Sequence, residues 1–178
     1  MSLRNTLQGW GWLSKTFHWF MAVLILVQIP LGLYAVNLKL SPLKLDVFLW
    51  HKSIGILILL LVTIRLLWRL NNIIPVALDN NAWLQRLASL VHNLLYGLMF
   101  LLPLSGWVIS SSANIPVKLF WLIPLPSLVD PDPALKLLAT EVHYACVVIL
   151  IITLVMHIGG AAMHHFWLRD NILRRMWF

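Results

Sequence analysis

Charged residues are scarce in this sequence, and acidic residues are the scarcest. Only 11% of the 178 residues are Asp, Glu, Lys or Arg, whereas 61% are hydrophobic. Soluble domains usually contain about 25% charged residues, so the shortage argues against a water-soluble globule. The 13 basic residues outnumber the six acidic ones, but no basic cluster lies on a soluble module. The surplus therefore gives no reason to expect a nucleic-acid partner.

Cysteine is almost absent. Cys146 is the single one, so the chain cannot form an intramolecular disulfide bond, and the C-x-x-C-H motif that attaches haem covalently is missing. Structural zinc sites usually rely on thiolate ligands, which one cysteine cannot supply. These absences exclude a disulfide scaffold and a c-type cytochrome.

Four apolar runs occupy most of the chain, and each is about as long as the 20 residues that a helix needs to cross the hydrocarbon core of a bilayer. The runs cover residues 17–36, 48–68, 90–110 and 142–163. The second reaches this length only by including His51, Lys52 and Arg65. Ionisable side chains at membrane depth are costly and normally face the interior of a bundle. We therefore expect an all-α membrane protein, one domain over residues 1–178, with four transmembrane helices.

Basic residues lie mainly on one side of this predicted bundle. The side with both termini and the loop 71–81 has eight basic and two acidic residues, whereas the other side has five and four. The positive-inside rule therefore places both termini in the cytoplasm. The outer segment 111–136 contains five of the nine prolines, which prevent a regular helix. Its apolar stretch 119–123 is expected in the outer membrane interface, with Trp121 as an anchor.

Histidine is the strongest signal. All seven histidines lie within or at the end of a predicted membrane helix: His18, His51, His92, His143, His157, His164 and His165. A single histidine in a membrane helix is readily explained by a hydrogen bond between helices. Seven in four helices instead indicate ligand sites, because membrane helices rarely carry ionisable residues.

The histidines are expected to form two layers. His143 and His157 are 14 residues apart, almost a whole number of helical turns, so they project from one face about 21 Å apart. His51 should lie at the outer level with His143, and His18 and His92 at the inner level with His157. Each layer then contains imidazoles from different helices, and the spacing leaves open which two inner imidazoles form a pair.

Haem explains these layers better than zinc or copper. Bis-histidine ligation of haem needs only two imidazoles on opposite helices, and helix bundles often provide it, whereas a structural zinc site needs four ligands. Gly32, Gly106 and Arg65 each follow a histidine of their own helix by the same 14 residues. A glycine leaves room for a flat macrocycle, and Arg65 can pair with a haem propionate. Two b haems, one near each face, would conduct electrons across the membrane.

Longer segments around the histidines resemble the prokaryotic cytochrome b561 family over essentially the whole chain. They are His18-Trp19, His51-Lys52-Ser53-Ile54-Gly55, Arg65-Leu66-Leu67-Trp68-Arg69, Glu141-Val142-His143, Met163-His164-His165-Phe166 and Arg169-Asp170-Asn171. The resemblance implies a multi-pass protein of the bacterial inner membrane that contains two b haems. It also implies that His51 and His143 hold the outer haem, and that His18 and His157 hold the inner one.

The resemblance further implies an activity. The best-known member of the family oxidises superoxide at the outer side and reduces ubiquinone at the cytoplasmic side, which makes it a superoxide:quinone oxidoreductase. His92 and His164 match the positions associated with the quinone end. His165 is expected to extend toward lipid head groups, and a role for Lys15 at the quinone end is left open, as is a protein partner.

Two other functions remain as alternatives. The nearer one is a relay subunit that passes electrons between quinol and a dehydrogenase or hydrogenase partner. The more remote one is a haem or metal carrier, which the near-absence of acidic residues inside the helices argues against.

Overall fold

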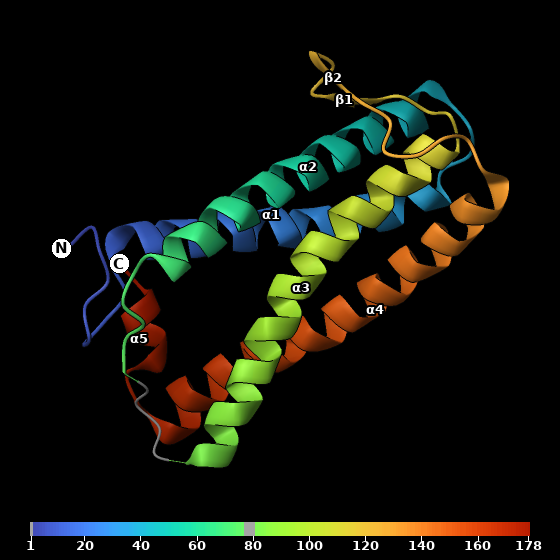
Figure 1. Ribbon diagram of the computed structural model, residues 1–178. Coiled ribbons are helices and arrows are strands. Elements are labelled where there is room, and N and C mark those ends of the chain that lie inside the picture. Colours follow the sequence, from blue (N-terminus) through green and yellow to red (C-terminus); the bar gives the residue numbers. More distant parts are fainter. Residues whose placement is uncertain (1, 77–80) are drawn as a thin grey trace.

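The computed structural model describes residues 2–76 and 81–178. Residues 77–80 of the predicted loop lie outside the described residues, and they include Asp79, one of the two acidic residues counted on the side of the termini. Four long helices dominate the described chain (Figure 1): α1 (Trp12–Asn37), α2 (Pro42–Leu70), α3 (Ala82–Ser112) and α4 (Pro133–Met163). Each contains one of the predicted apolar runs and is long and apolar enough to cross a membrane. The predicted all-α membrane fold with four spanning helices is confirmed.

Helix boundaries follow from capping residues that flank the apolar runs. Ser41 caps α2, where its hydroxyl accepts a hydrogen bond from the backbone N–H of Lys44, and Pro42 follows at the first helical position. Asp132 and Pro133 do the same for α4, since the Asp132 carboxylate accepts from the N–H groups of Ala134 and Leu135. Such caps satisfy backbone donors that lack partners inside the helix. They extend α2 and α4 beyond the runs predicted from hydrophobicity.

The helices pack as two antiparallel pairs, α1 with α2 and α3 with α4, which meet along α2 and α3. A buried apolar core joins them at mid-height: Met21, Ile25, Ile58, Val62, Leu98, Met99, Cys146 and Leu150. On every helix these residues lie, in sequence, between the outer and inner layers predicted for the histidines. Large apolar side chains elsewhere on the helices are exposed, as expected for a surface that contacts lipid. The core therefore separates the two layers.

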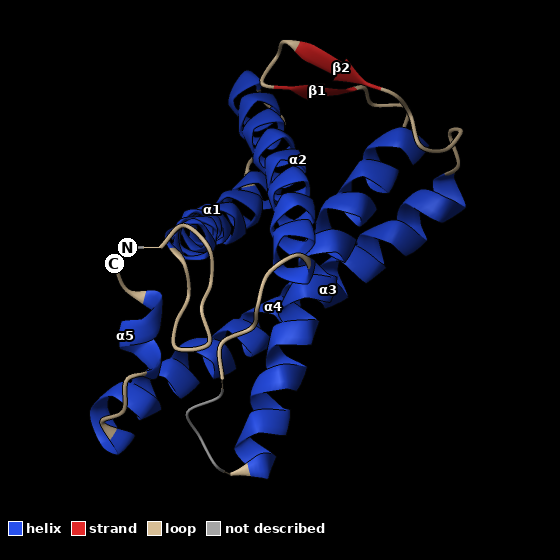
Figure 2. Cartoon of the chain, turned by 60° about the vertical axis from the view of Figure 1, so that its left-hand side comes forward, coloured by secondary structure: helices blue, strands red, loops and turns tan. Residues whose placement is uncertain are grey.

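A short antiparallel hairpin projects from the end of the bundle opposite the termini (Figure 2). Strand β1 (Val117–Leu119) pairs with β2 (Ile123–Leu125), and Leu119 accepts a hydrogen bond from the N–H of Leu122 across the turn, at 3.0 Å. The central turn residues Phe120 and Trp121 have φ angles of 46° and 65°, the pattern of a type I′ turn. This hairpin was not predicted from the sequence, which indicated only an irregular, proline-rich segment.

The hairpin is attached to α2 beside His51. The Ser53 hydroxyl, which is fully buried, accepts from the N–H of Phe120 at 2.9 Å and donates to the Lys118 carbonyl at 3.3 Å. The Trp50 indole packs edge-on against the rings of Phe120 and Trp121. Bulky residues rarely adopt a positive φ, and these contacts hold two of them in that conformation.

At the other end, three segments that are distant in sequence are tied together next to both termini (Figure 1). Here α4 continues as a five-residue π-helix, η1 (His164–Leu168), followed by the short helix α5 (Ile172–Met176). The Arg175 guanidinium donates to the carbonyls of Gln8 and Val76, each at 2.7 Å from one of its nitrogens. Lys15 donates to the Trp177 carbonyl at 2.6 Å. Hydrogen bonds thus connect the N-terminal segment, the start of the loop between α2 and α3, and the C-terminal segment at this end of the bundle.

Candidate functional site

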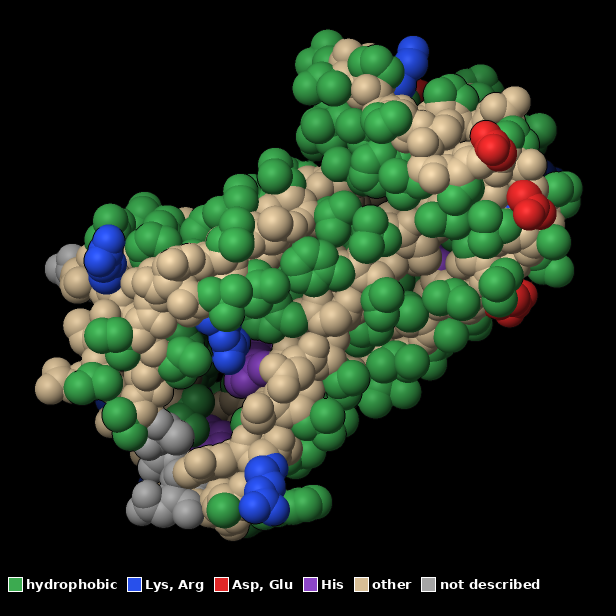
Figure 3. Space-filling view, viewed as in Figure 1, with side chains coloured by type: hydrophobic (Ala, Val, Ile, Leu, Met, Phe, Trp, Pro, Cys, Tyr) green, Lys and Arg blue, Asp and Glu red, His purple; other side chains and the backbone are tan. Residues whose placement is uncertain are grey.

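Three histidines from three helices meet at the end of the bundle with the termini. The ring centroids of His18 on α1 and His157 on α4 are 6.0 Å apart, and those of His92 on α3 and His157 are 5.3 Å apart. In the space-filling view, histidine side chains lie in a hollow beside α3, next to basic side chains (Figure 3). The structure therefore brings the three predicted inner histidines together around His157, and both His18 and His92 are neighbours of that residue.

Arg65 reaches the same inner cluster. Its Nη2 donates a hydrogen bond to Nδ1 of His18 at 3.3 Å, and its guanidinium lies 5.5 Å from the centre of the Tyr96 ring. Arg69 lies over the same ring at 5.4 Å. Within residues 2–76 and 81–178, no carboxylate lies within ion-pairing distance of Arg65. The inner cluster thus contains a half-buried positive charge without an anionic partner among the described side chains.

The outer layer contains His51 and His143, each packed against a glycine of another helix. A Cβ atom added to Gly32 on α1 would lie 2.6 Å from Cε1 of His51, and one added to Gly106 on α3 would lie 3.5 Å from Cε1 of His143. In this structure, each of the two glycines therefore leaves room for an imidazole ring. The expectation that they make room for a macrocycle stays a prediction.

The hydrogen bonds of His143 determine which of its nitrogens carries the proton. Ser105 Oγ lies 2.9 Å from Nδ1 of His143 and 3.0 Å from the Leu102 carbonyl. The one hydroxyl proton goes to the carbonyl, because a carbonyl can only accept, so Ser105 accepts from Nδ1–H of His143. This leaves Nε2 with a free lone pair. Metal-ligating histidines usually have their other nitrogen held in this way, and Ser105 was missed by the sequence reasoning.

His51 differs from His143, because its Nδ1 nitrogen has no hydrogen-bond partner among the described residues. This nitrogen is buried, and the same is true of Oε1 of Gln28, which also lacks a partner among the described residues. The two side chains are neighbours, since Nε2 of Gln28 donates to the His51 backbone carbonyl at 2.7 Å. A buried polar atom without a partner requires an explanation. A neutral imidazole with an unused nitrogen is a donor set suited to a transition metal such as iron.

These residues fit haem better than a metal ion held by the protein alone. Among the described residues, no three His, Cys, Asp or Glu side chains gather closely enough to bind a metal ion by themselves. The inner histidines instead occur as neighbours on different helices, with ring centroids 5.3–6.0 Å apart, which suits ligation of a haem iron by two imidazoles. A free Nε2 on His143, the orphaned nitrogen of His51 and the unpaired charge of Arg65 are all features that a haem with propionates would satisfy.

His164 lies at the start of η1 and pairs with an acid that the sequence analysis did not single out. Its Nδ1 is 2.5 Å from Oδ2 of Asp170, while Oδ1 of Asp170 accepts from the N–H of Ile172 at 2.9 Å. Partial burial acts to raise the pKa of Asp170, but the hydrogen bonds from Ile172 and His164 outweigh it and lower that pKa. His165 does not join this pair, since its ring packs against Phe166.

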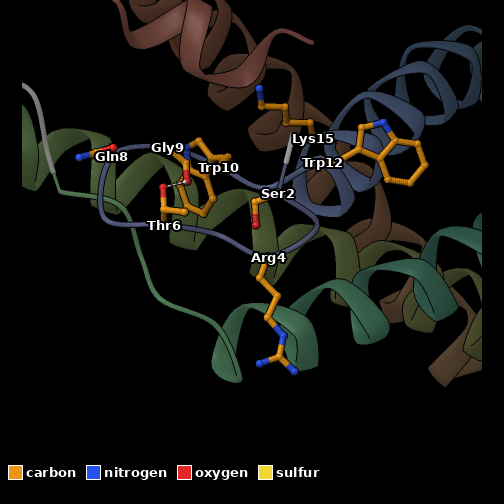
Figure 4. Close-up of a pocket in the computed structure, with 8 residues that line it drawn as sticks. All are labelled: Ser2, Arg4, Thr6, Gln8, Gly9, Trp10, Trp12 and Lys15. Atoms are coloured by element: carbon orange, nitrogen blue, oxygen red, sulfur yellow. Dashed lines mark hydrogen bonds between the residues drawn. The ribbon is translucent and has the colours of Figure 1, made fainter.

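A separate cavity of about 320 Å³ lies within the N-terminal segment (Figure 4). Its lining consists of Ser2, Arg4, Thr6, Gln8, Gly9, Trp10, Trp12 and Lys15. None of the seven histidines lines it, and the side chains of Arg4 and Lys15 point away from each other in Figure 4. This cavity is therefore distinct from the histidine clusters.

Comparison with known proteins agrees with the geometry. The sequence matches the family described as prokaryotic cytochrome b561 over residues 9–178, a range that contains all seven histidines. It is 32% identical to cytochrome b561 homolog 2 of Escherichia coli (strain K12) over 185 aligned residues, which cover 99% of this chain and 95% of that protein. The predicted resemblance is confirmed: the chain belongs to the prokaryotic cytochrome b561 family of haem-binding membrane electron-transfer proteins.

Proposed function

We propose that the protein conducts electrons across the membrane through two b haems. His51 and His143 hold the outer haem, and His18 and His157 hold the inner one. The observation that carries this proposal is the separation of the imidazoles into two groups at opposite ends of one apolar core. When bound, the haems would supply one-electron carriers at the two ends of the bundle.

The choice of His18 over His92 as the inner ligand follows the family resemblance, which matches His18 and His157 to the inner haem. The ring centroids of His18 and His157 are 6.0 Å apart and those of His92 and His157 are 5.3 Å apart, so His18 and His92 both lie close to His157. His92 then remains beside the inner haem without ligating it.

Arg65 is the proposed partner of an inner-haem propionate. In the structure it donates to His18 Nδ1. A histidine that ligates iron carries a proton on its other nitrogen, and a guanidinium cannot donate to that N–H group. Ligation by His18 would therefore release Arg65, whose charge then needs an anion nearby. A haem propionate would supply that anion and could accept a bidentate pair from Arg65.

The inner end is the proposed site of quinone reduction. His92 lies next to His157, and His164, at the start of η1, follows His157 by about two turns on about the same face. Quinone takes up two protons with two electrons, and histidines are suited to supply protons near neutral pH. Because both termini lie at this end and basic residues predominate there, this end of the bundle is on the cytoplasmic side of a bacterial inner membrane.

The outer end is the proposed site of superoxide oxidation. Two superoxide anions would each give up one electron and leave as O₂, and these two electrons with two protons convert quinone to quinol. Lys52 follows His51 directly and adds a positive charge that attracts an anion. A protein partner is not needed in this scheme, which separates it from the relay subunit.

Two experiments test the proposal. The haem content of the purified protein, measured as pyridine haemochrome against protein mass, is expected to be two per chain, and His51→Ala or His143→Ala should reduce it to one. Stopped-flow mixing with superoxide should then reduce both haems without any other protein, and ubiquinone should reoxidise them. Haems that are reduced only by quinol or by an added dehydrogenase would refute superoxide oxidation in favour of the relay. Rapid transfer of haem to an acceptor protein would favour the carrier.

A further inference from the structure

Asp170 and His164 are brought together by an unusual ending of α4. In a regular α-helix, side chains six residues apart point in directions about 120° apart. In this chain the last turn widens into the π-helix η1, and Arg169 then adopts a left-handed conformation with φ of 53°. The N–H of Asp170 bonds back to the His164 carbonyl at 3.2 Å. These features turn the Asp170 carboxylate onto the His164 ring, and π-helical turns of this kind are frequent at functional sites.

The pairing fixes the chemistry of both ring nitrogens. The pKa of Asp170 is lowered, so its carboxylate is ionised at neutral pH and can only accept a hydrogen bond. Nδ1 of His164 is therefore the donor, and Nε2 is the nitrogen left to exchange protons with another molecule. The His164 and Asp170 side chains are 15% and 29% exposed, respectively. Water can thus reach the pair at the end of the bundle where both termini lie.

The pair lies beyond the inner histidines, toward the C-terminal end of the chain. His164 follows His157 by two turns, which places it about 10 Å further along nearly the same face of the helix. The short helix α5 packs against η1 and carries Arg174 and Arg175. Arg175 is held by backbone carbonyls of the N-terminal segment and of Val76. Within the described residues, Asp170 is the carboxylate that pairs with His164.

We infer that Asp170 is a positioning residue for proton delivery to quinone: it orients His164 so that Nε2 donates the proton to a quinone oxygen. This inference rests on the proposed quinone site. In each of two successive transfers, one electron arrives from the haem side and one proton leaves Nε2 to form an O–H bond on the quinone. His164 regains its proton from cytoplasmic water each time, and the Asp170 carboxylate balances the positive charge that the ring then carries.

A purely structural role for Asp170 makes a different prediction, because an asparagine can still accept the hydrogen bond from Nδ1–H but carries no charge. The test uses protein with both haems bound and chemically reduced, and mixes it with decyl-ubiquinone in a stopped-flow instrument. A parallel mixing uses ferricyanide, which takes an electron without a proton. Asp170→Asn should slow oxidation by quinone about 10- to 100-fold, which is part of the roughly 10²- to 10⁴-fold that a positioned acid–base group contributes. It should leave oxidation by ferricyanide unchanged.

Three further measurements sharpen the test. Asp170→Glu should recover part of the quinone rate, since it restores the charge. His165→Asn is the matched control, because it removes the neighbouring imidazole outside the pair, and it should behave as wild type. The solvent isotope effect on the quinone reaction should be larger in Asp170→Asn than in wild type, since proton transfer then limits the rate.

The outcomes that overturn the inference are distinct from those that overturn the proposed function. A quinone rate in Asp170→Asn within about twofold of wild type would make the contact structural only. Equal slowing with quinone and ferricyanide would mean that Asp170 acts on the haems or the fold. If wild-type haems are oxidised by ferricyanide but not by quinone, the proposed quinone site fails and the inference fails with it.

Discussion

Substitution of Gly32 offers a direct test of the outer ligand, because the space beside this glycine is already taken. A Cβ atom at this position would lie 2.6 Å from Cε1 and 3.1 Å from Nδ1 of the His51 ring. Carbon atoms in van der Waals contact are about 3.5–4.0 Å apart. The ring or the α1 backbone would therefore have to move by about 1 Å. The imidazole is held within a packed bundle, so this movement displaces the proposed ligand of the outer haem.

The expected cost can be set against the known gain from replacing glycine in a helix. Alanine is favoured over glycine in a helix interior by about 1 kcal/mol. Forcing an extra methyl group into a packed interior costs about 1–3 kcal/mol. Gly32→Ala should therefore be neutral to moderately destabilising for the apoprotein. Its main effect should be on the outer haem, since a ligand displaced by about 1 Å no longer meets the geometry of an axial bond.

The chain contains two matched controls for this experiment. The Cβ of Gly106→Ala would lie 3.5 Å from the His143 ring, an ordinary contact, and that of Gly97→Ala on the same helix would meet nothing within 4 Å. We expect Gly32→Ala to retain about one haem per chain, and both control variants to retain two. The assay is the pyridine haemochrome ratio, with redox titration identifying which haem is lost. If Gly32→Ala retains two haems with unchanged midpoint potentials, the assignment of His51 as the outer-haem ligand in its position beside α1 would be refuted.

Three further predictions concern charges and hydrogen bonds around the histidines. Arg65→Leu should lower the midpoint potential of the inner haem by about 60 mV, or ~1.4 kcal/mol, because a positive charge that favours the reduced state is lost. Unchanged redox titrations would exclude a propionate contact. Ser105→Ala should raise the midpoint potential of the outer haem, since His143 loses the acceptor that makes it a stronger donor to iron, whereas Ser105→Thr should preserve it. Because the pKa of Asp170 is lowered in the folded state, its ionised carboxylate stabilises the fold at pH values above the ordinary pKa of the group. This stabilisation is lost as the pH falls through the folded-state pKa. The difference in Tm between wild type and Asp170→Asn should thus narrow in acid, and a constant difference would contradict this.

Much of the architecture could be predicted because it follows from one-dimensional patterns. Apolar runs of spanning length predict membrane helices, and a 14-residue interval places two side chains on one helical face whatever the neighbouring helices do. The same reasoning brought His18, His92 and His157 to one level, where the structure has them in contact. Helix ends were predicted less well, because the caps Ser41 and Asp132 lie outside the apolar runs.

The features that sequence patterns missed depend on contacts between segments. Ser105 is one of several serines on α3, and only its distance to His143 identifies it. The aromatic residues Phe120 and Trp121 are poor formers of a type I′ turn, which usually contains Asn or Gly, so the hairpin has no local signal. Asp170 was visible within a matching segment, but its pairing with His164 depends on a widened helical turn that no periodicity indicates.

The apolar core between the two histidine layers determines which charges can cross the bundle. An electron can tunnel through a packed hydrocarbon interior, whereas a proton needs a chain of hydrogen-bonding groups or water, and an isolated ion in such surroundings costs many kcal/mol. Met21, Val62, Leu98 and Leu150 are buried in this layer and provide no such chain. A redox protein built in this way would pass electrons between the two faces of the membrane without opening a path through which protons could leak back.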